Sequence, residues 1–374
     1  MSNYRLGGTV RLSVLSVAYP FAPVQADPVG GAEKILYELD RAVVAAGHRS
    51  IVIAPAGSQV SGLLHEIPRH GVLEPPTREL VHAAVQARIR AVLNSESPDV
   101  IHLHGPDFAA YLPPPGIPLL VTLHLPVRLY PAAALAPLRP NTYLVPVSAT
   151  QARDLQGGHV LEPIGNGVEI PEPRAHARRN YLLALGRICP EKGFHEALDA
   201  AARANLPLLL AGRVFGYPEH ERYFHEQIVP RLDRARRWIG SVAGARKRRL
   251  LAAARCVLVP SRIAASSSLV AMEALAAGTP VIAYRVGALP EIVEDGVTGF
   301  VVDDVPSMAR AIGAVERIDS ERCRRAARER FSLERTTSAY LQLYQRLVQQ
   351  RARCALSVDR DAASRASACS TAPR

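Results

Sequence analysis

The amino-acid sequence predicts an α/β protein built from two doubly wound domains with a cleft between them. Two series of short apolar strands, separated by helix-length segments, indicate two parallel sheets with helices packed on both faces. A length of 374 residues with 48% apolar side chains is sufficient for two domains, each with its own core. A Pro- and Arg-rich segment at 171–179 separates the two series, and a hinge there would leave the cleft open to a ligand.

The first series of elements extends to about residue 170. It begins with an apolar strand at Arg11–Val17, which a Pro-rich loop connects to a helix starting at Gly30-Gly31 and ending near Gly47. Apolar side chains of this helix recur on one stripe, as expected for a helix packed on a sheet. The later elements are a helix near Glu79–Leu93 and strands at Ser50–Ala54, Val100–Leu103, Leu119–Leu123 and Tyr143–Val147.

The second series occupies residues 171–331 and is followed by a helix at 332–350, where apolar residues recur at helical spacing. The remaining residues, 351–374, are rich in Ala, Ser and Arg and lack an apolar pattern, so we expect a disordered tail. The expected domains are therefore 1–170 and 171–331. The second sheet is predicted from strands at Tyr181–Leu185, Leu206–Leu210, Trp238–Ile239, Cys256–Val259 and Pro280–Ala283.

The cysteines and the hydropathy of the sequence indicate the cellular compartment in which the protein is expected. The five cysteines are scattered, with no CxxC and no Cys/His spacing, which argues against a disulfide framework or a zinc site. A reducing cytoplasm is the natural inference. No apolar run reaches the roughly 18 residues that a bilayer-spanning helix requires. Two placements follow, a cytoplasmic protein or a peripheral protein at the inner face of the membrane.

The formal net charge of +11 is concentrated in one part of the chain. Residues 222–255 contain ten Arg or Lys and two acidic residues. No aromatic residues are interleaved in the manner that stacks bases, so we expect no nucleic-acid partner. A solvated basic face is one interpretation, and peripheral contact with anionic phospholipid headgroups is the other.

One segment of the second series predicts a phosphate site. The strand Cys256–Val259, a helix at Leu269–Ala277 and the strand at Pro280–Ala283 form a β-α-β unit. The helix is entered through Ser266, Ser267 and Ser268, any of which could cap its first amides, and such a positive helix end suits a phosphate. Glu273, roughly one turn inside, is placed to hydrogen-bond ribose hydroxyls. The alternative is a surface glutamate on a core helix.

Three further groups have residue types suited to ligand binding. The amides of Gly30-Gly31 can approach a phosphate or sugar without obstruction by side chains. Arg187 and Lys192 flank a tight loop and would converge on a diphosphate, unless the loop is simply solvated. His102, His104 and His124 follow predicted strands at the edge that lines a ligand crevice. No carboxylate completes a metal-ligand set with them, so no metal is expected.

The order and spacing of these motifs resemble the retaining glycosyltransferases of family 4 (glycosyl transferases group 1). That family has the GT-B fold, two Rossmann-like domains facing a central cleft, and the resemblance extends from Val10 to about Val348. It implies a hexosyltransferase-like enzyme that moves a sugar from a nucleotide-diphosphate donor to an acceptor hydroxyl with retention, without metal or cofactor. The acceptor, expected at loops of the first domain such as Ser58–Pro76, stays open among glycans, lipid-linked molecules and small molecules.

The resemblance also implies residue roles. His124 would lie beside the reacting sugar, and Arg187 and Lys192 would neutralise charge on the departing nucleotide. Ser148 and the turn Asn166-Gly167-Val168 match scaffold positions, and Glu291 matches a position near the cleft that could equally cap a helix. Donor and nucleotide binding would fall to Gly30, Gly31, Ser267, Ser268, Leu269, Val270 and Glu273.

The sequence departs from the family pattern at one position. The family carries two glutamates separated by seven residues; Glu273 matches the second, and Ala265 occupies the place of the first. In the family the first glutamate contacts donor-sugar hydroxyls, so its loss affects the sugar more than the nucleotide. The alternative function is therefore a transfer-deficient protein that binds nucleotide sugar.

Overall fold

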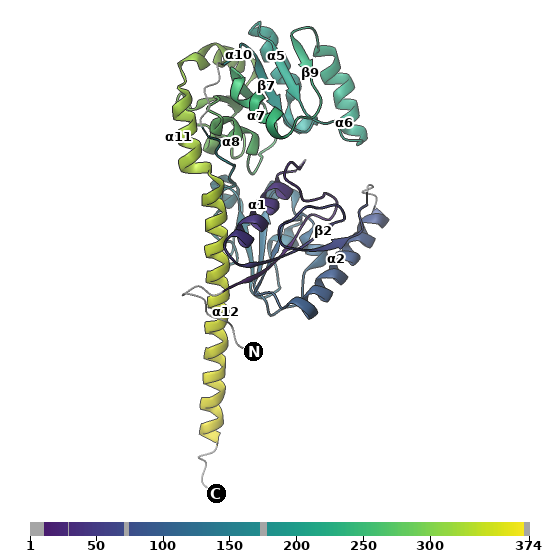
Figure 1. Cartoon of the computed structure of the whole chain (residues 1–374), viewed down its shortest axis with the longest axis vertical. Coiled ribbons are helices and arrows are strands. Elements are labelled where there is room, and N and C mark those ends of the chain that lie inside the picture. Colours follow the sequence, from purple (N-terminus) through teal and green to yellow (C-terminus); the bar gives the residue numbers. More distant parts are fainter. Residues whose placement is uncertain (1–10, 29, 71–74, 173–177, 370–374) are drawn as a thin grey trace.

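The computed structural model describes residues 11–28, 30–70, 75–172 and 178–369, and it contains two six-stranded sheets (Figure 1). All strand pairs in both sheets are parallel. The strand orders are β3-β2-β1-β4-β5-β6 and β12-β11-β10-β7-β8-β9. In each sheet the order reverses beside the first strand of the series, which places a ligand crevice at the carboxyl ends of the strands.

The strands of the first sheet are β1 (Ser13–Val17), β2 (Arg49–Pro55), β3 (Leu63–Ile67), β4 (Val100–Leu103), β5 (Leu119–Leu123) and β6 (Thr142–Pro146). Its helices are α1 (Gly31–Ala45), α2 (Pro75–Glu96), α3 (Ala132–Leu135) and α4 (Ala149–Arg153). The six predicted elements after the first strand are confirmed within a few residues. Strand β3 was not predicted, because this edge strand is only half-buried and lacks an apolar run.

The strands of the second sheet are β7 (Leu182–Leu185), β8 (Leu208–Ala211), β9 (Arg236–Trp238), β10 (Cys256–Val259), β11 (Val281–Tyr284) and β12 (Gly299–Val302). Its helices are α5 (Phe194–Arg203), α6 (Pro218–Tyr223), α7 (Gly244–Ala253), α8 (Leu269–Ala276), α9 (Leu289–Ile292), α10 (Val305–Ala314) and α11 (Ser320–Phe331). The five predicted strands are confirmed. The edge strand β12 was missed; it has only four residues and begins at a glycine.

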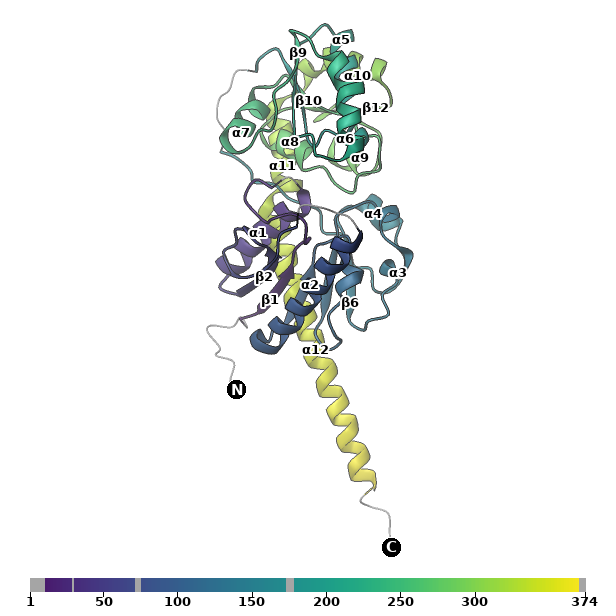
Figure 2. The ribbon, with the colours of Figure 1, turned by 90° about the vertical axis from the view of Figure 1, so that its right-hand side faces the viewer.

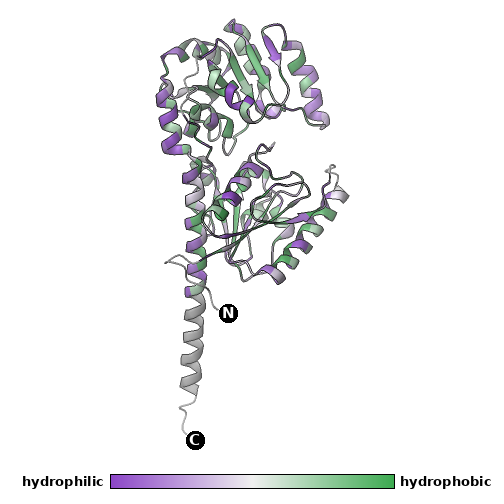
Figure 3. Ribbon diagram, viewed as in Figure 1, coloured by the Kyte–Doolittle hydropathy of each residue, from purple (hydrophilic) through white to green (hydrophobic). Residues whose placement is uncertain are grey.

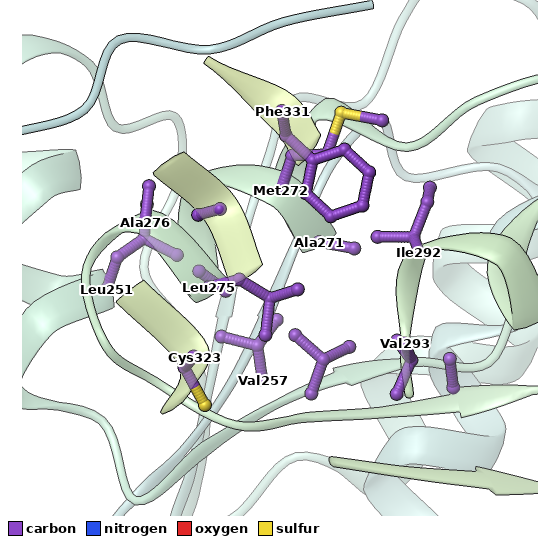
Figure 4. Close-up of a cluster of buried hydrophobic side chains, with 14 of the residues drawn as sticks. Leu251, Val257, Ala271, Met272, Leu275, Ala276, Ile292, Val293, Cys323 and Phe331 are labelled. Atoms are coloured by element: carbon purple, nitrogen blue, oxygen red, sulfur yellow. The ribbon is translucent and has the colours of Figure 1, made fainter. Parts of the chain in front are cut away.

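Apolar side chains fill the space between sheets and helices. Figure 3 shows the strands of both sheets largely in the hydrophobic colour. In the second domain, one face of the sheet packs against α8 and α11, and Figure 4 shows Val257, Leu275 and Cys323 within this cluster. Fully buried strands of this kind read as continuous apolar runs, which explains why the central strands were predicted well.

The last helix, α12 (Leu333–Cys369), crosses back from the second domain to the first (Figures 1 and 2). Tyr340 and Tyr344 are fully buried in the core beside β4 and β5. Their hydroxyls bond Thr122 and His102 at 2.8 Å each. At the crossing point, a β-carbon on Gly167 would lie 2.6 Å from the Thr336 hydroxyl oxygen, so the turn predicted as scaffold requires glycine for close approach.

The C-terminal segment differs from the prediction. Residues 351–369 continue α12 as helix rather than forming a disordered tail, and this part extends beyond the body of the molecule (Figure 2). Its Ala- and Arg-rich composition has high helix propensity, which favours continuation of a helix that is already nucleated. Residues 370–374, part of the predicted domain join (173–177) and part of the predicted acceptor loop (71–74) lie outside the described residues. Among the helices described, none combines the length and apolar character needed to cross a membrane.

Candidate functional site

The N-termini of α1 and α8 meet between the two domains. Helix α1 begins at Gly31 after Gly30, and α8 begins with Leu269 and Val270. A β-carbon on Gly31 would lie 3.4 Å from Cδ1 of Leu269, so the two helix ends are in contact across the cleft. The predicted donor-binding residues of both domains are therefore brought together. Free amides at two positive helix ends make this part of the cleft suitable for an anion.

A buried carboxylate closes over the glycine at position 30. The Glu33 side chain folds back over Gly30, where an added β-carbon would lie 1.9 Å from Glu33 Oε2. Glu33 is buried, and this burial raises the pKa of its carboxyl group, while the nearby Arg187 guanidinium opposes the rise. A carboxylate of the first domain thus lies within electrostatic reach of the predicted diphosphate-binding arginine of the second.

The three serines before α8 have different partners. Ser268 is the N-cap, and its hydroxyl oxygen accepts a hydrogen bond from the Ala271 amide at 3.3 Å. The hydroxyl of Ser266 accepts a hydrogen bond from the Gln151 side chain of the first domain at 3.1 Å. The Ser267 hydroxyl is buried and has no partner among the described residues. A buried hydroxyl without a partner at the start of α8 calls for an explanation such as a ligand.

Glu273, the predicted ribose ligand, has a cationic partner that the sequence did not predict. Its carboxylate accepts a hydrogen bond from Lys247 Nζ at 2.8 Å. The same ammonium group lies 4.0 Å from the Asp27 carboxylate of the first domain. Asp27 also accepts a hydrogen bond from the amide of Gly244, at the start of α7, at 3.0 Å. Lys247 therefore connects the predicted ribose carboxylate to the opposite wall of the cleft.

Arg187 and Lys192, in the loop after β7, are two cations without an ion-pair partner among the described residues. Lys192 ends a short 3-10 turn, η3 (Pro190–Lys192), and burial lowers the pKa of its ammonium group, with a smaller contribution from Arg187. Among the described residues, no carboxylate oxygen lies within 4.0 Å of either side chain. Gly193 has φ +62°, and a β-carbon there would lie 2.2 Å from the Pro260 carbonyl oxygen, so this loop packs tightly against the end of β10.

The three predicted histidines form a connected group. His102 is fully buried, with ring nitrogens 2.7 Å from the Thr122 hydroxyl and 2.8 Å from the Tyr344 hydroxyl. The rings of His104 and His124 are stacked, and His104 Nδ1 lies 3.2 Å from His124 Nε2. Burial lowers the pKa of His124 to about 3, and it also lowers the pKa of His104 and His102. All three rings are therefore neutral at pH 7.

The bond between His104 and His124 has a preferred direction. His104 Nε2 is buried and has no partner among the described residues. If His124 were the donor, the His104 Nε2 proton would be buried without an acceptor, which costs more than an unpaired acceptor nitrogen. We therefore assign His104 Nδ1 as the donor to His124 Nε2. This assignment leaves the Nδ1–H of His124 free to donate to a ligand.

Gln151, which the sequence did not single out, links the His124 loop to the second domain. Its side-chain nitrogen lies 2.9 and 2.7 Å from the carbonyl oxygens of Leu123 and Leu125, on either side of His124. The same nitrogen bonds Ser266 across the cleft. Its position in the first turn of α4, after the N-cap Ser148, was the one feature of the sequence that could have indicated a role. No local pattern specified its partners.

Glu291 makes a second connection between the domains. Its carboxylate accepts hydrogen bonds from the amides of Ala149, at 3.0 Å, and Thr150. These are the first amides of α4, so Glu291 caps a helix. This is one of the two roles that the sequence predicted for it. The capped helix belongs to the other domain, which a sequence pattern does not reveal.

Ala265, at the position of the missing glutamate, lines a cavity of about 70 Å³ between the domains. Arg128, Thr150 and Gln151 of the first domain line the same cavity. The backbone of Ala265 is held by Gly287, where a β-carbon would lie 2.5 Å from the Ala265 carbonyl oxygen. The loop is therefore packed as a defined part of the cleft, although its carboxylate is absent.

Two family profiles match consecutive parts of the chain. The profile "Glycosyltransferase Family 4" matches residues 29–170, and "Glycosyl transferases group 1" matches residues 179–316. Glycogen synthase of Mycobacterium tuberculosis (strain ATCC 25618 / H37Rv) is 27% identical over 89% of the chain and 94% of its own length. Phosphatidyl-myo-inositol mannosyltransferase of Mycobacterium leprae (strain TN) is 28% identical over 79% of the chain and 86% of its own length.

The chain belongs to the family 4 glycosyltransferases. This glycosyltransferase has the GT-B fold. Sucrose-phosphate synthase (tll1590) from Thermosynechococcus elongatus superposes with a TM-score of 0.77 at 21% identity, over 90% of this chain and 100% of that one. Anabaena Alr3699/HepE, in complex with UDP-glucose, has a TM-score of 0.66 at 19% identity, over 93% of this chain and 100% of that one.

Proposed function

We propose that this glycosyltransferase transfers a sugar from a nucleoside-diphosphate donor to an acceptor hydroxyl with retention at the anomeric carbon. The observation that carries the proposal is the pair Arg187 and Lys192, which has no counter-ion among the described residues. Lys192 is half-buried and Arg187 is exposed. A half-buried cation is stabilised by an anion, and a diphosphate is the anion that the family's donors carry. UDP-glucose bound to a structural neighbour supports a donor of this class.

In this proposal, each group of the site has a role that its position supports. Arg187 and Lys192 stabilise charge on the leaving diphosphate, and the helix amides at Gly30, Gly31 and the start of α8 assist them. These groups supply the electrostatic role that a divalent ion has elsewhere, so the transfer needs no metal. Glu273 holds the ribose and Ser267 is available to the donor. His124 presents its Nδ1–H toward the reacting sugar.

Ala265 favours the alternative, a transfer-deficient protein that binds nucleotide sugar. Loss of a carboxylate that bonds a sugar hydroxyl costs about 1.5 to 3 kcal/mol, or one to two orders of magnitude in rate. Such a cost slows transfer without abolishing it. The relatives matched over most of their length are named as transferases, which favours activity.

Calorimetric titration with several nucleoside diphosphates, together with a screen of donor hydrolysis, tests both functions. The native protein and Ala265→Glu should both bind one diphosphate class, and the native protein should turn over its donor. Nucleotide binding with turnover only in Ala265→Glu would establish the transfer-deficient alternative. Absence of nucleotide binding in both proteins would contradict both functions.

Lys192→Ala tests the cation pair directly. We expect kcat to fall by about 100-fold or more, because stabilisation of the leaving group is lost while the fold is retained. The exposed Arg203 at the end of α5 provides a matched charge-removing control, Arg203→Ala, with unchanged kcat. Unaltered turnover in Lys192→Ala, with a normal unfolding transition, would remove the lysine from the mechanism.

The exposed arginines of the second domain support peripheral contact with an anionic membrane from the cytoplasm. Arg246, Arg248 and Arg249 on α7 and Arg237 on β9 are exposed and form no ion pair within the described chain. Cosedimentation with phosphatidylcholine vesicles, with and without phosphatidylglycerol, checks this contact. Binding should require the anionic lipid and decrease at high salt; equal binding to both vesicles would contradict it.

A further inference from the structure

Three side chains with metal-ligating atoms meet beside the loop that carries Arg187 and Lys192. Cys189 and Glu191 belong to that loop, and His220 lies on α6. The ligand atoms of the three side chains all lie within 4.8 Å of one another. Cys189 is 1% exposed, His220 is 9% exposed and Glu191 is half-buried. The group therefore lies inside the second domain, next to the predicted diphosphate site.

Two polar atoms of this group have no partner among the described residues. Both Glu191 Oε2 and His220 Nδ1 are buried without a hydrogen bond. The Cys189 thiol has a long contact, 3.6 Å, with the Arg187 carbonyl oxygen, and it also interacts with the Glu191 carboxylate. A buried carboxylate oxygen and a buried imidazole nitrogen without partners, on side chains whose ligand atoms lie this close together, call for a ligand or an ion. We propose that Cys189, Glu191 and His220 bind a divalent transition metal, with Zn²⁺ as the best match.

The ligand set favours zinc over the hard cations. Zn²⁺ binds thiolate at about 2.3 Å and imidazole or carboxylate at about 2.0 to 2.2 Å, usually in a tetrahedron. The separation of at most 4.8 Å between the three ligand atoms is compatible with their binding one such ion. A thiolate ligand disfavours Mg²⁺ and Ca²⁺. With three protein ligands, the fourth position takes water.

Charge and proton balance are consistent with this site despite the neighbouring cations. On binding, the Cys189 sulfur–hydrogen bond breaks, a sulfur–zinc bond forms and the proton passes to solvent, without oxidation or reduction. The thiolate and the Glu191 carboxylate together carry two negative charges, which compensate the two positive charges of the metal. The bound site is therefore neutral, whereas the metal-free site, with a neutral thiol and an ionised carboxylate, carries one negative charge. Binding thus removes one negative charge beside Arg187 and Lys192, and the released proton limits the change to that one unit.

The site joins the phosphate loop to α6. Cys189 and Glu191 lie between Arg187 and Lys192, so a metal held there and by His220 fixes the backbone that presents both cations. This role is structural and separate from the proposed transfer, which needs no metal. The two proposals are tested independently. A protein that binds no Zn²⁺ could still transfer a sugar, and a protein without transfer activity could still bind Zn²⁺.

Metal titration of the untagged full-length protein, stripped with a chelator, tests the proposal. Zn²⁺ is titrated against a chromophoric chelator, and Co²⁺ is added separately as a spectroscopic probe. We expect one high-affinity ion per chain and the intense near-ultraviolet band of cobalt bound to thiolate. Cys189→Ser and His220→Ala should weaken Zn²⁺ binding by more than the ~100-fold that loss of an outer-shell partner costs, and remove that band.

Matched controls separate this site from other Cys and His residues. Cys323→Ser alters another buried thiol of the same domain, and His225→Ala alters an exposed histidine near α6. Both should retain affinity and spectrum. Glu191→Gln, which keeps the shape of the side chain, provides a variant that should fold normally yet bind Zn²⁺ more weakly. Equal Zn²⁺ affinity in native protein and Glu191→Gln, or a cobalt spectrum without the thiolate band, would overturn the proposal.

Discussion

His124 acts as a neutral hydrogen-bond donor because of the residues around it rather than through its own properties. Burial keeps it uncharged, and His104 occupies one of its ring nitrogens. Only the other nitrogen remains for a ligand. The chemical state of the residue beside the reacting sugar therefore depends on a neighbour that touches no substrate.

His104→Leu should lower kcat by about 10- to 100-fold with little change in the KM for the donor, because the neutral tautomer of His124 is no longer enforced. His104→Asn should restore part of the activity, since its amide can donate in place of Nδ1–H. Nitrogen-15 shifts of His124 report the tautomer directly. Equal losses in both variants, with an unaltered His124 spectrum, would indicate a purely structural role.

Stability should decrease as the pH falls below about 6.5. The folded-state pKa of buried His102 and His104 is depressed, so the unfolded chain binds more protons between the ordinary value, about 6.5, and the lower folded value. Each fully buried histidine then removes about 1.4 kcal/mol of unfolding free energy per pH unit in that window. Denaturant unfolding at pH 7.5 and pH 5.5 measures the loss. His225→Ala should leave it unchanged, and a flat profile would contradict the buried neutral rings.

Local sequence patterns could not predict which residues contact one another across the cleft. The motifs predicted Glu273, Arg187, Lys192 and the histidines, because each follows a strand or lies about one turn inside a helix that such a strand precedes. Lys247 and Gln151 were missed, since the first lies in a run of basic residues and the second has an ordinary helical position. Their importance comes from contacts with residues far away in the chain, which only the folded structure brings together.

At the scale of elements, the predictions succeeded where burial is complete. The central strands are continuous apolar runs, whereas the missed strands β3 and β12 lie at sheet edges with short or polar sequences. The prediction of a disordered tail was wrong at residues 351–369 for the opposite reason. Absence of an apolar stripe indicates absence of packing, but α12 continues as helix through 351–369 without needing such a stripe.

Helix α4 depends on a cap from the other domain. Glu291→Ala should expose the amides of Ala149 and Thr150 and increase their hydrogen exchange by about 10-fold, corresponding to about 1.4 kcal/mol of lost capping. Glu294→Ala, which removes an exposed carboxylate nearby, should have no effect. Unchanged exchange in Glu291→Ala would show that the domains are not joined at this helix in solution.

At the scale of the whole molecule, α12 connects the two domains through buried polar bonds. Tyr344→Phe should lower the free energy of unfolding by about 1 to 3 kcal/mol, because a fully buried nitrogen of His102 loses its partner. Denaturant unfolding provides the measurement, and nucleotide binding should persist. Tyr143→Phe, at a half-buried tyrosine of β6, is the matched control. No difference between the two variants would contradict a role for this bond.

The crossing of α12 also has a consequence for biosynthesis. The ribosome makes the first sheet early, but the tyrosines that complete its core, Tyr340 and Tyr344, are among the last residues of the globular body to emerge. The domain that is synthesised first therefore cannot finish folding first, in contrast to the usual vectorial order. Until translation reaches α12, a nascent chain exposes part of an apolar core, and the two halves reach their native state together.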